Sequence, residues 1–361
     1  MNRQHYFQEM KQIYSISKTD RRKTINLDLN ENLFGCAPEV IDAIKQIDSS
    51  VISSYPQAFE FEQQYADSIG LEPDQVLATN GADAGIELII KSLNRDIEIV
   101  TVSPTFKMYE ITAGWYGHSV IRVDYQSLDA FPLKKVIKEM KKSGRMLFLA
   151  NPDSPVGGWL SPDSIATLAR ESMPNPVVID ETYYQFAGET AVSLIAQHPN
   201  LIFLHSFSKA YGLAGLRLGT VIAVKETITL LRKWIKPFET NQIALLAGLT
   251  TLESSSYLDS LIRRVKQSKE KLSLAIKAAG FDVINSNANF ILIRAGIWAP
   301  DIVRKLAGRN FQVKLIQHPP LLDGFIRVAA MPNPILDDFI TTFNDILEEI
   351  WRNSRTKFPR H

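Results

Sequence analysis

The sequence lacks several features that would assign it to a special class of protein. It contains a single cysteine, Cys36, which excludes an internal disulfide and favours a reducing compartment. Its net charge is only +1 over 361 residues, so the composition provides no basic surface for nucleic acid or an anionic membrane. No apolar run approaches the ~20 residues that span a bilayer, and the first residues lack the apolar core of a signal peptide. These absences predict a cytoplasmic protein with neither a membrane nor a nucleic-acid partner.

The length and composition are those of a globular protein with more than one core. Hydrophobic residues make up 45% and charged residues 22% of the chain, and 361 residues exceed the size of a typical single domain. The pattern of apolar runs suggests four regions. They are an N-terminal arm with part of a small domain (1–45), a large domain (46–242), a linking helical region (243–279) and a small C-terminal domain (280–361).

Short apolar runs alternate with helical segments through the predicted large domain. The runs that we predict as strands are 76–79, 97–102, 120–123, 146–150, 176–179 and 201–204. Buried strands alternating with helices predict an α/β fold, in which helices sandwich a mainly parallel sheet. In such sheets ligands bind at the carboxyl ends of the strands, where several turns of this chain carry unusual polar residues. The strands and helices after residue 280 predict a smaller α+β unit.

One lysine stands out directly after the last of these strands. Lys209 follows Ser206 and Ser208, and Arg217 comes shortly after it among glycines. Burial among small residues favours the neutral, nucleophilic form of a lysine, and hydroxyls with an arginine suit a phosphate dianion. A lysine that forms an imine beside a phosphate site is what pyridoxal phosphate requires. Taken alone, the stretch also fits a surface lysine in a loop of serines and glycines.

Four motifs together resemble the pyridoxal-phosphate-dependent aminotransferases of fold type I. They are the segment around Lys209, Asp180-Glu181-Thr182-Tyr183, Asn80-Gly81-Ala82-Asp83 and Leu29-Asn30-Glu31-Asn32. The resemblance covers nearly the whole chain and is closest to the histidinol-phosphate aminotransferase branch. It implies an aspartate-aminotransferase-like fold and bound pyridoxal 5'-phosphate. It also implies transfer of an amino group between an amino acid or amine and a 2-oxo acid.

The resemblance assigns four residues to the cofactor ring. Lys209 would bind the cofactor covalently and move the proton during transfer, and Asp180 would keep the ring nitrogen protonated. Tyr183 matches the tyrosine that hydrogen-bonds the phenolic oxygen of the ring, and Tyr109 matches the aromatic residue that stacks on it. The residues alone leave other roles open, since Asp180 can cap a helix and both tyrosines can be packing residues.

The phosphate of the cofactor would lie at the start of a helix. The turn Gly81-Ala82-Asp83 leads into that helix, whose free amides and positive end suit a dianion. Ser206, Ser208 and Arg217 would complete the site. Tyr55 matches a tyrosine that reaches the phosphate across a dimer interface, which implies a homodimer with shared active sites. The alternative for Tyr55 is an ordinary loop tyrosine.

The substrate would contact residues from both ends of the chain. Arg327 matches a family arginine that binds a carboxylate or phosphate through its planar guanidinium. Asn30 and Tyr14 match positions that border the substrate pocket.

The chain departs from the family pattern at two positions. The family motif Asn-Asn-Pro-Thr-Gly here reads Asp153-Ser154-Pro155-Val156-Gly157, so Ser154 replaces the asparagine expected on the phenolic oxygen. A serine is shorter and offers one donor, so the tuning of the ring would differ. Lys314 replaces a second phosphate-binding arginine, and it supplies charge without a planar fork. The sequence therefore predicts the cofactor more firmly than the substrate.

Three functions fit these residues. The first is an aminotransferase, and the second is a decarboxylase on the same scaffold, similar to threonine-phosphate decarboxylase, which the segment around Arg327 would also suit. The third is a non-catalytic relative that binds the cofactor. The presence of Lys209, Asp180, Tyr183 and Arg217 argues against the third, and fold alone would not separate them.

Overall fold

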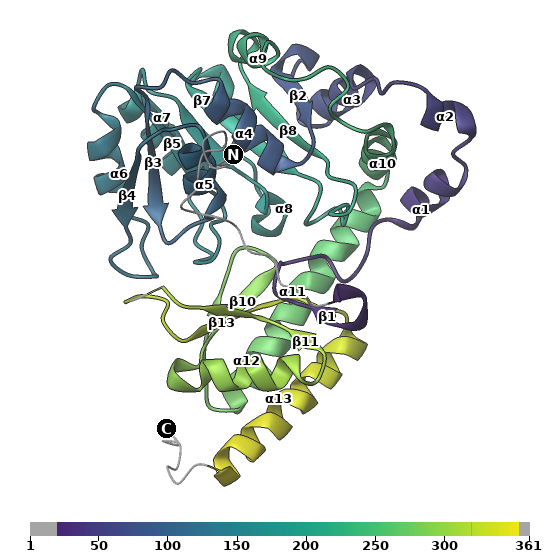
Figure 1. Ribbon diagram of the computed structural model, residues 1–361, viewed down its shortest axis with the longest axis vertical. Helices are drawn as coiled ribbons and strands as arrows, with labels where there is room; N and C mark the ends of the chain where they lie inside the picture. The colour runs from purple at the N-terminus through teal and green to yellow at the C-terminus, as the bar shows by residue number, and fades with distance from the viewer. Residues whose placement is uncertain (1–19, 319, 354–361) are drawn as a thin grey trace, which may run out of the picture.

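The structure is a computed structural model that describes residues 20–318 and 320–353 (Figure 1). Tyr14, one of the predicted substrate residues, lies outside the described residues. A large sheet of seven strands and a small sheet of four lie one above the other in Figure 1. We call the large sheet with its helices the large-sheet unit, and the small sheet with its helices the small-sheet unit. The long helix α11 (Ser255–Ala278) runs between the two units (Figure 1).

The large sheet has the strand order β2-β8-β7-β6-β5-β3-β4. Its strands are β2 (Val76–Thr79), β3 (Glu98–Ser103), β4 (Val120–Asp124), β5 (Arg145–Ala150), β6 (Val177–Asp180), β7 (Leu201–Ser206) and β8 (Gly219–Ala223). Neighbouring strands are parallel except for β8, which is antiparallel to both β2 and β7. The mainly parallel sheet expected from the sequence is confirmed. Strand β8 was not predicted from the sequence, because its apolar run begins at a glycine directly after the glycine-containing stretch around Lys209.

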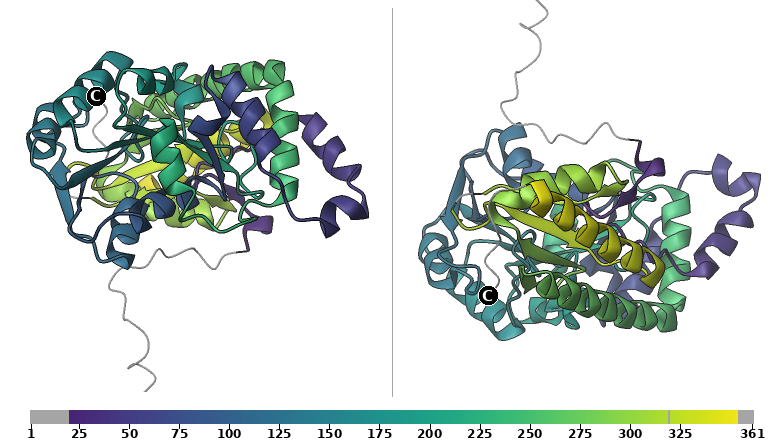
Figure 2. Two further views of the ribbon diagram at one scale, coloured as in Figure 1. Left: turned by 90° about the horizontal axis from the view of Figure 1, so that it is seen from above. Right: turned by 90° about the horizontal axis from the view of Figure 1, so that it is seen from below.

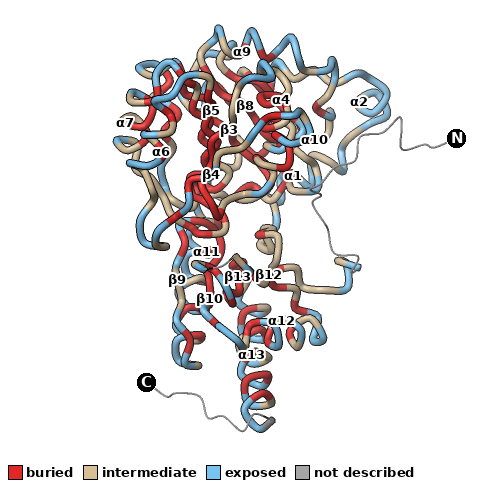
Figure 3. The backbone as a smooth tube through the Cα atoms, turned by 60° about the vertical axis from the view of Figure 1, so that its left-hand side comes forward, coloured by how far each residue is buried: buried red, intermediate tan, exposed pale blue. Residues whose placement is uncertain are grey.

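Helices cover both faces of the large sheet, because its strands are apolar on both faces. In β6, for example, Val177 and Ile179 belong to one core cluster and Val178 to the other. One face is covered by α4 (Ala82–Lys91), α5 (Met108–Trp115) and α9 (Lys225–Leu231). The other is covered by α3 (Phe59–Ser68), α6 (Leu133–Met140), α7 (Pro162–Ser172) and α10 (Gln242–Glu253). Figure 2 shows this layered arrangement from two sides, and Figure 3 shows the buried residues concentrated in the sheet.

The small sheet is antiparallel, with the strand order β12-β13-β10-β9. Its strands are β9 (Asp282–Asn285), β10 (Phe290–Arg294), β12 (Lys314–Ile316) and β13 (Phe325–Ala329). One face packs against α11, α12 (Ala299–Ala307) and α13 (Asn333–Asn353). The other face contributes Phe290, Leu292 and Phe325 to the core of the large-sheet unit. This face of the small sheet therefore packs against the large-sheet unit through a shared apolar contact.

The remaining elements connect these units. They are α1 (Pro38–Lys45), α2 (Ser49–Ser53), α8 (Tyr184–Ala187), β1 (Ile25–Asn26) and β11 (Phe311–Gln312). Strand β1 pairs in parallel with β11, so the start of the described chain joins the small-sheet unit. The helical region expected over 243–279 is two helices, α10 and α11, which meet at Ser254. In the part of the chain that the structure describes, no helix combines the length and apolar character needed to cross a membrane.

Candidate active site

Lys209 lies in the loop after β7, where the N-terminal segment crosses the large-sheet unit. Its Nζ donates a hydrogen bond of 2.7 Å to the carbonyl oxygen of Leu29 and lies 5.9 Å from the centre of the Tyr183 ring. The Tyr183 hydroxyl accepts a hydrogen bond of 2.9 Å from Nδ2 of Asn30. Asn30 is buried in a left-handed conformation (φ 56°), which a short polar side chain tolerates better than most. The structure thus brings together three of the predicted site residues.

Asp180 ends β6 and lies buried beside this group. Its Oδ2 accepts a hydrogen bond of 2.8 Å from the Tyr109 hydroxyl, and its Oδ1 accepts one of 3.0 Å from the amide of Thr182. Burial raises the pKa of the Asp180 carboxyl, because these neutral donors only partly replace water. A carboxylate in this setting favours a positively charged N–H group as an additional partner. Tyr109 is itself fully buried, so it serves both the core and this contact.

The turn between β2 and α4 forms a cup with Arg217. Gly81 has φ 85°, and a Cβ atom at this position would lie 2.7 Å from Nη2 of Arg217. Arg217 donates hydrogen bonds to Oγ of Ser208 (3.4 Å) and to Oδ2 of Asp83 (2.9 Å). The Asp83 side chain therefore holds the guanidinium, while the free amides at the start of the ten-residue helix α4 remain suited to an anion.

Two more of the predicted residues complete this cup. Ala82 is the first residue of α4, and a Cβ atom on Gly219 of β8 would lie 2.6 Å from its amide nitrogen. Ser206 ends β7, and its Oγ accepts a hydrogen bond of 3.2 Å from the amide of Ser208. Glycine at 219 lets the strand approach the helix start closely, which places the Ser206–Ser208 loop next to it.

Arg327 of β13 reaches from the small-sheet unit into the large-sheet unit. Its Nη1 donates a hydrogen bond of 2.9 Å to Oγ of Ser154, and its Nη2 donates one of 2.6 Å to the carbonyl oxygen of Asp28. Lys314 lies directly opposite Arg327 in the pairing of β12 with β13, so both side chains leave the same face of the sheet. The Lys314 side chain is exposed, yet its pKa is lowered by desolvation and by the charge of Arg327.

The donor set of this region fits pyridoxal phosphate. Lys209 would hold its aldehyde carbon, Asp180 its ring nitrogen, and the cup formed by Gly81, Ser208 and Arg217 its phosphate. Asn30 provides a further observation, because its Oδ1 is buried without a hydrogen-bond partner among the described residues. A buried polar atom without a partner is costly in a protein that has no ligand for it.

The aminotransferase class I and II family model matches residues 22–343. The chain belongs to this family. It is a pyridoxal-phosphate-dependent aminotransferase of fold type I, and the fold, cofactor and reaction class expected from the sequence are confirmed. Amino acids and keto acids are the substrates of this family.

A curated relative and two solved structures are similar to this aminotransferase. The chloroplastic histidinol-phosphate aminotransferase of Nicotiana plumbaginifolia is 32% identical over 314 residues, which cover 85% of this chain and 75% of the relative. The structure of histidinol-phosphate aminotransferase from Sinorhizobium meliloti in complex with pyridoxal-5'-phosphate superposes with a TM-score of 0.85 at 23% identity, covering 91% of each chain. That of L-threonine-O-3-phosphate decarboxylase from Porphyromonas gingivalis has a TM-score of 0.78 at 23% identity, covering 90% of this chain and 99% of the other. These two structures show the shared fold.

Tyr55 stands apart from the other predicted site residues of this aminotransferase. Its side chain is 76% exposed and stacks on Phe238, with ring centres 4.5 Å apart. No hydrogen bond of the described chain ties Tyr55 to the Arg217 cup, so its predicted role in binding phosphate depends on a second chain.

Two residues near the proposed site, Asp153 and His318, were not predicted from the sequence. Asp153 was noted only as part of an altered motif, yet it is a buried carboxylate with three hydrogen-bond donors around it. His318 follows β12, and its Nε2 lies 3.2 Å from Oγ of Ser103 at the carboxyl end of β3. The replacement of asparagine by aspartate at 153 was a usable signal. Nothing in the sequence around His318 indicated its contact with β3.

Proposed function

We propose that the enzyme transfers an amino group between a phosphorylated amine of the histidinol-phosphate type and a 2-oxo acid. The observation that carries this proposal is the pairing of Lys314 with Arg327. One arginine suffices for a carboxylate, whereas a phosphate dianion gains from a second cation next to it. The charge of Lys107 also contributes to lowering the pKa of Lys314, so a third cation lies in this neighbourhood. The name of the curated relative supports the same substrate class.

The residues of the chain divide the chemistry among them. Lys209 Nζ is the base placed to move a proton at the substrate carbon that bears the amino group. Asp180 holds the proton on the ring nitrogen, and Arg327 orients the anionic group of the substrate while Ser154 fixes its Nη1. Tyr183, held by Asn30, presents its hydroxyl toward the same space as Lys209. When bound, pyridoxal phosphate supplies the electron sink for the bonds at that carbon.

A direct test is a single-turnover screen of the cofactor-loaded enzyme against amines and amino acids. We expect histidinol phosphate to change the absorption of the cofactor in the manner of amino transfer, and histidinol without phosphate to react far more weakly. Carbon dioxide release from a phosphorylated amino acid would instead identify a decarboxylase. No reaction with histidinol phosphate would overturn the proposed substrate and leave the aminotransferase class intact.

We further propose that the enzyme is a homodimer in which Tyr55 completes the phosphate site of the partner chain. Tyr55 and Phe238 stack on each other and are both exposed, and Ile52 and Phe59, which are close to Tyr55 in the chain, are exposed as well, so apolar side chains are available for a contact with a second chain. Light scattering and cofactor retention should be measured over a dilution series. Dissociation and loss of cofactor are expected to run together, and a fully active monomer at high dilution would contradict the dimer.

A further inference from the structure

Asp153 ties together three segments at the carboxyl edge of the large sheet. Its Oδ1 accepts hydrogen bonds from Oγ1 of Thr105 (2.6 Å) and from the amide of Ser154 (2.7 Å). Its Oδ2 accepts one from the hydroxyl of Tyr125 (3.0 Å). Thr105 follows β3, Tyr125 follows β4 and Ser154 follows β5, and these three strands are neighbours in the sheet. One carboxylate therefore fixes three loops relative to one another.

Two of these loops also carry contacts to the small-sheet unit. Ser154 accepts the hydrogen bond from Arg327, and Ser103, two residues before Thr105, contacts His318. The position of Arg327 relative to the large sheet thus depends on loops that Asp153 holds. Because Asp153 is only 2% exposed, no bulk water can replace its hydrogen bonds when one of them is lost.

We propose that Asp153 is a positioning residue, whose charge state sets, through Ser154, how firmly Arg327 holds the anionic group of the substrate. This inference rests on the proposed role of Arg327 as the group that binds that anion. An ionised carboxylate can accept hydrogen bonds from all three donors at these distances. A neutral carboxyl must direct its own proton at a neighbour, so one of the three contacts is weakened and the Ser154 loop is less well fixed.

The groups around Asp153 place this change near neutral pH. Thr105, Tyr125 and the amide of Ser154 are uncharged donors, and the charged neighbour on β6 is the carboxylate of Asp180. Tyr109 of α5 also faces this cluster. With none of the contacts of the described chain providing a positive charge, burial raises the pKa of Asp153 to about 7. Substrate binding should therefore weaken as the pH falls below about 7.

The first experiment compares the wild type with Asp153→Asn as cofactor-loaded enzymes between pH 6 and 8.5. The asparagine carbonyl accepts from Thr105 and Ser154, and its amide can donate to the Tyr125 oxygen, so the loops stay linked while the titration disappears. In the wild type, KM for the amine should rise roughly tenfold as the pH falls across this range, the size of one lost hydrogen bond. In Asp153→Asn, KM should be nearly independent of pH and kcat should change little.

A second variant, Tyr125→Phe, distinguishes positioning from a purely structural role. The Tyr125 hydroxyl stabilises the anionic form of Asp153 and lowers its pKa. Removing this hydroxyl should shift the inflection in the plot of KM against pH to a higher pH. The double variant Tyr125→Phe with Asp153→Asn should show no such inflection. An inflection that persists in Asp153→Asn, or that stays in place in Tyr125→Phe, would overturn the proposal.

Thermal unfolding of the cofactor-free protein gives a readout that does not depend on catalysis. Since the pKa of Asp153 is higher in the folded than in the unfolded chain, the wild type should lose stability relative to Asp153→Asn as the pH rises from 5 to 7, and the difference should then level off. A difference that does not vary with pH would contradict the assigned titration. If histidinol phosphate is not a substrate, the same measurements with any amino acid that reacts still decide the role of Asp153.

Discussion

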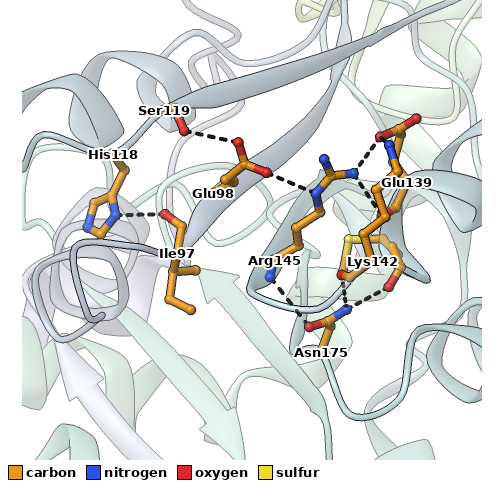
Figure 4. A network of polar contacts seen from close by, with 9 residues as sticks. Ile97, Glu98, His118, Ser119, Glu139, Lys142, Arg145 and Asn175 are labelled. Carbon is orange, nitrogen blue, oxygen red and sulfur yellow. Dashed lines mark hydrogen bonds and ion pairs between the residues drawn. The ribbon is translucent and has the colours of Figure 1, made fainter.

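The two edges of the large sheet differ in the partners of their buried charged groups. At the amino edge, Arg145 is buried between Glu98 (3.1 Å) and Glu139, and each of these contacts is an ion pair (Figure 4). Asn175 there donates its amide hydrogens to the carbonyl oxygens of Met140 (2.6 Å) and Lys142 (2.7 Å). At the carboxyl edge, the hydrogen-bond donors to Asp153 and Asp180 within the described chain are hydroxyls and amides.

This difference separates the scaffold from the site. At the amino edge the buried arginine has carboxylate partners within the chain, and Lys142 also pairs with Glu139, so that edge is complete without a ligand. Burying a carboxylate with only neutral donors lowers stability, and such arrangements persist where a ligand or substrate supplies the missing charge. The edge with the poorer electrostatic balance is the edge at which we propose that the reaction takes place, as expected for an open α/β sheet.

The largest expected effect is at the carboxyl edge. Replacing Lys209 by alanine should reduce turnover by at least about 10³-fold, roughly 4 kcal/mol of transition-state stabilisation, because Lys209 is the residue proposed to move the proton. Cofactor should still bind through the Arg217 cup, which equilibrium dialysis can measure. Lys225→Ala is the matched control, since Lys225 forms an exposed ion pair with Asp74 (2.7 Å) away from the site. Equal loss in both variants would show that the effect is not specific to Lys209.

The next effect concerns Asp180. Asp180→Asn keeps the shape and removes the charge, so single-turnover proton transfer should slow at least hundredfold, about 2.7 kcal/mol. Because burial raises the pKa of Asp180, the cofactor-free wild type should lose stability relative to cofactor-free Asp180→Asn as the pH rises. Thermal unfolding between pH 5 and 8 checks this sign. Near-normal turnover in Asp180→Asn would show that Asp180 has only a structural role.

The substrate cations should show a smaller and selective effect. Arg327→Ala should impair every substrate, whereas Lys314→Ala should impair a phosphorylated one, by about 1.5–3 kcal/mol for a lost charge-assisted contact. The measurement is kcat/KM for histidinol phosphate and for an unphosphorylated amino acid in both variants. Unchanged kinetics with histidinol phosphate in Lys314→Ala would remove the basis for a phosphorylated substrate.

The smallest expected effect on activity is at the amino edge. Arg145→Met should lower the free energy of unfolding by about 1–2 kcal/mol. This is less than for a fully buried ion pair, because Glu98 and Glu139 are partly exposed and solvent screens their charges. Turnover at a temperature where the variant is folded should remain that of the wild type. A change in kcat with no change in stability would contradict the assignment of a purely structural role to the amino edge.

Much of the fold followed from local patterns in the sequence. Short apolar runs between helical segments predicted the parallel strands, because a strand buried on both faces has no polar side. Strand β8 was missed, since a run that begins at Gly219 after a glycine-containing loop has no clear start. The break at Ser254 within the helical region expected over 243–279 was not located in advance, because the polar residues at 253–256 fit either a turn or an exposed helix face.

The site was predictable where a residue follows a strand and less so where it depends on packing. Lys209, Asp180 and the turn at Gly81 each follow a recognisable strand, so their convergence was expected. The contacts of Arg327 with Ser154 and of Asp153 with Tyr125 join segments far apart in the chain, which no local pattern encodes. The domain limits at 45, 242 and 279, the roles of the site residues and the cytoplasmic location stay predictions.

The most direct test of the central claim is to locate the cofactor on the chain. The cofactor-loaded enzyme is reduced with borohydride and digested, and the peptide that carries the cofactor is identified by mass spectrometry. The site at the carboxyl edge predicts modification of the peptide containing Lys209, with none after Lys209→Ala. Modification of Lys225 or Lys233 instead would contradict the assignment of Lys209 and with it the role of this edge of the sheet.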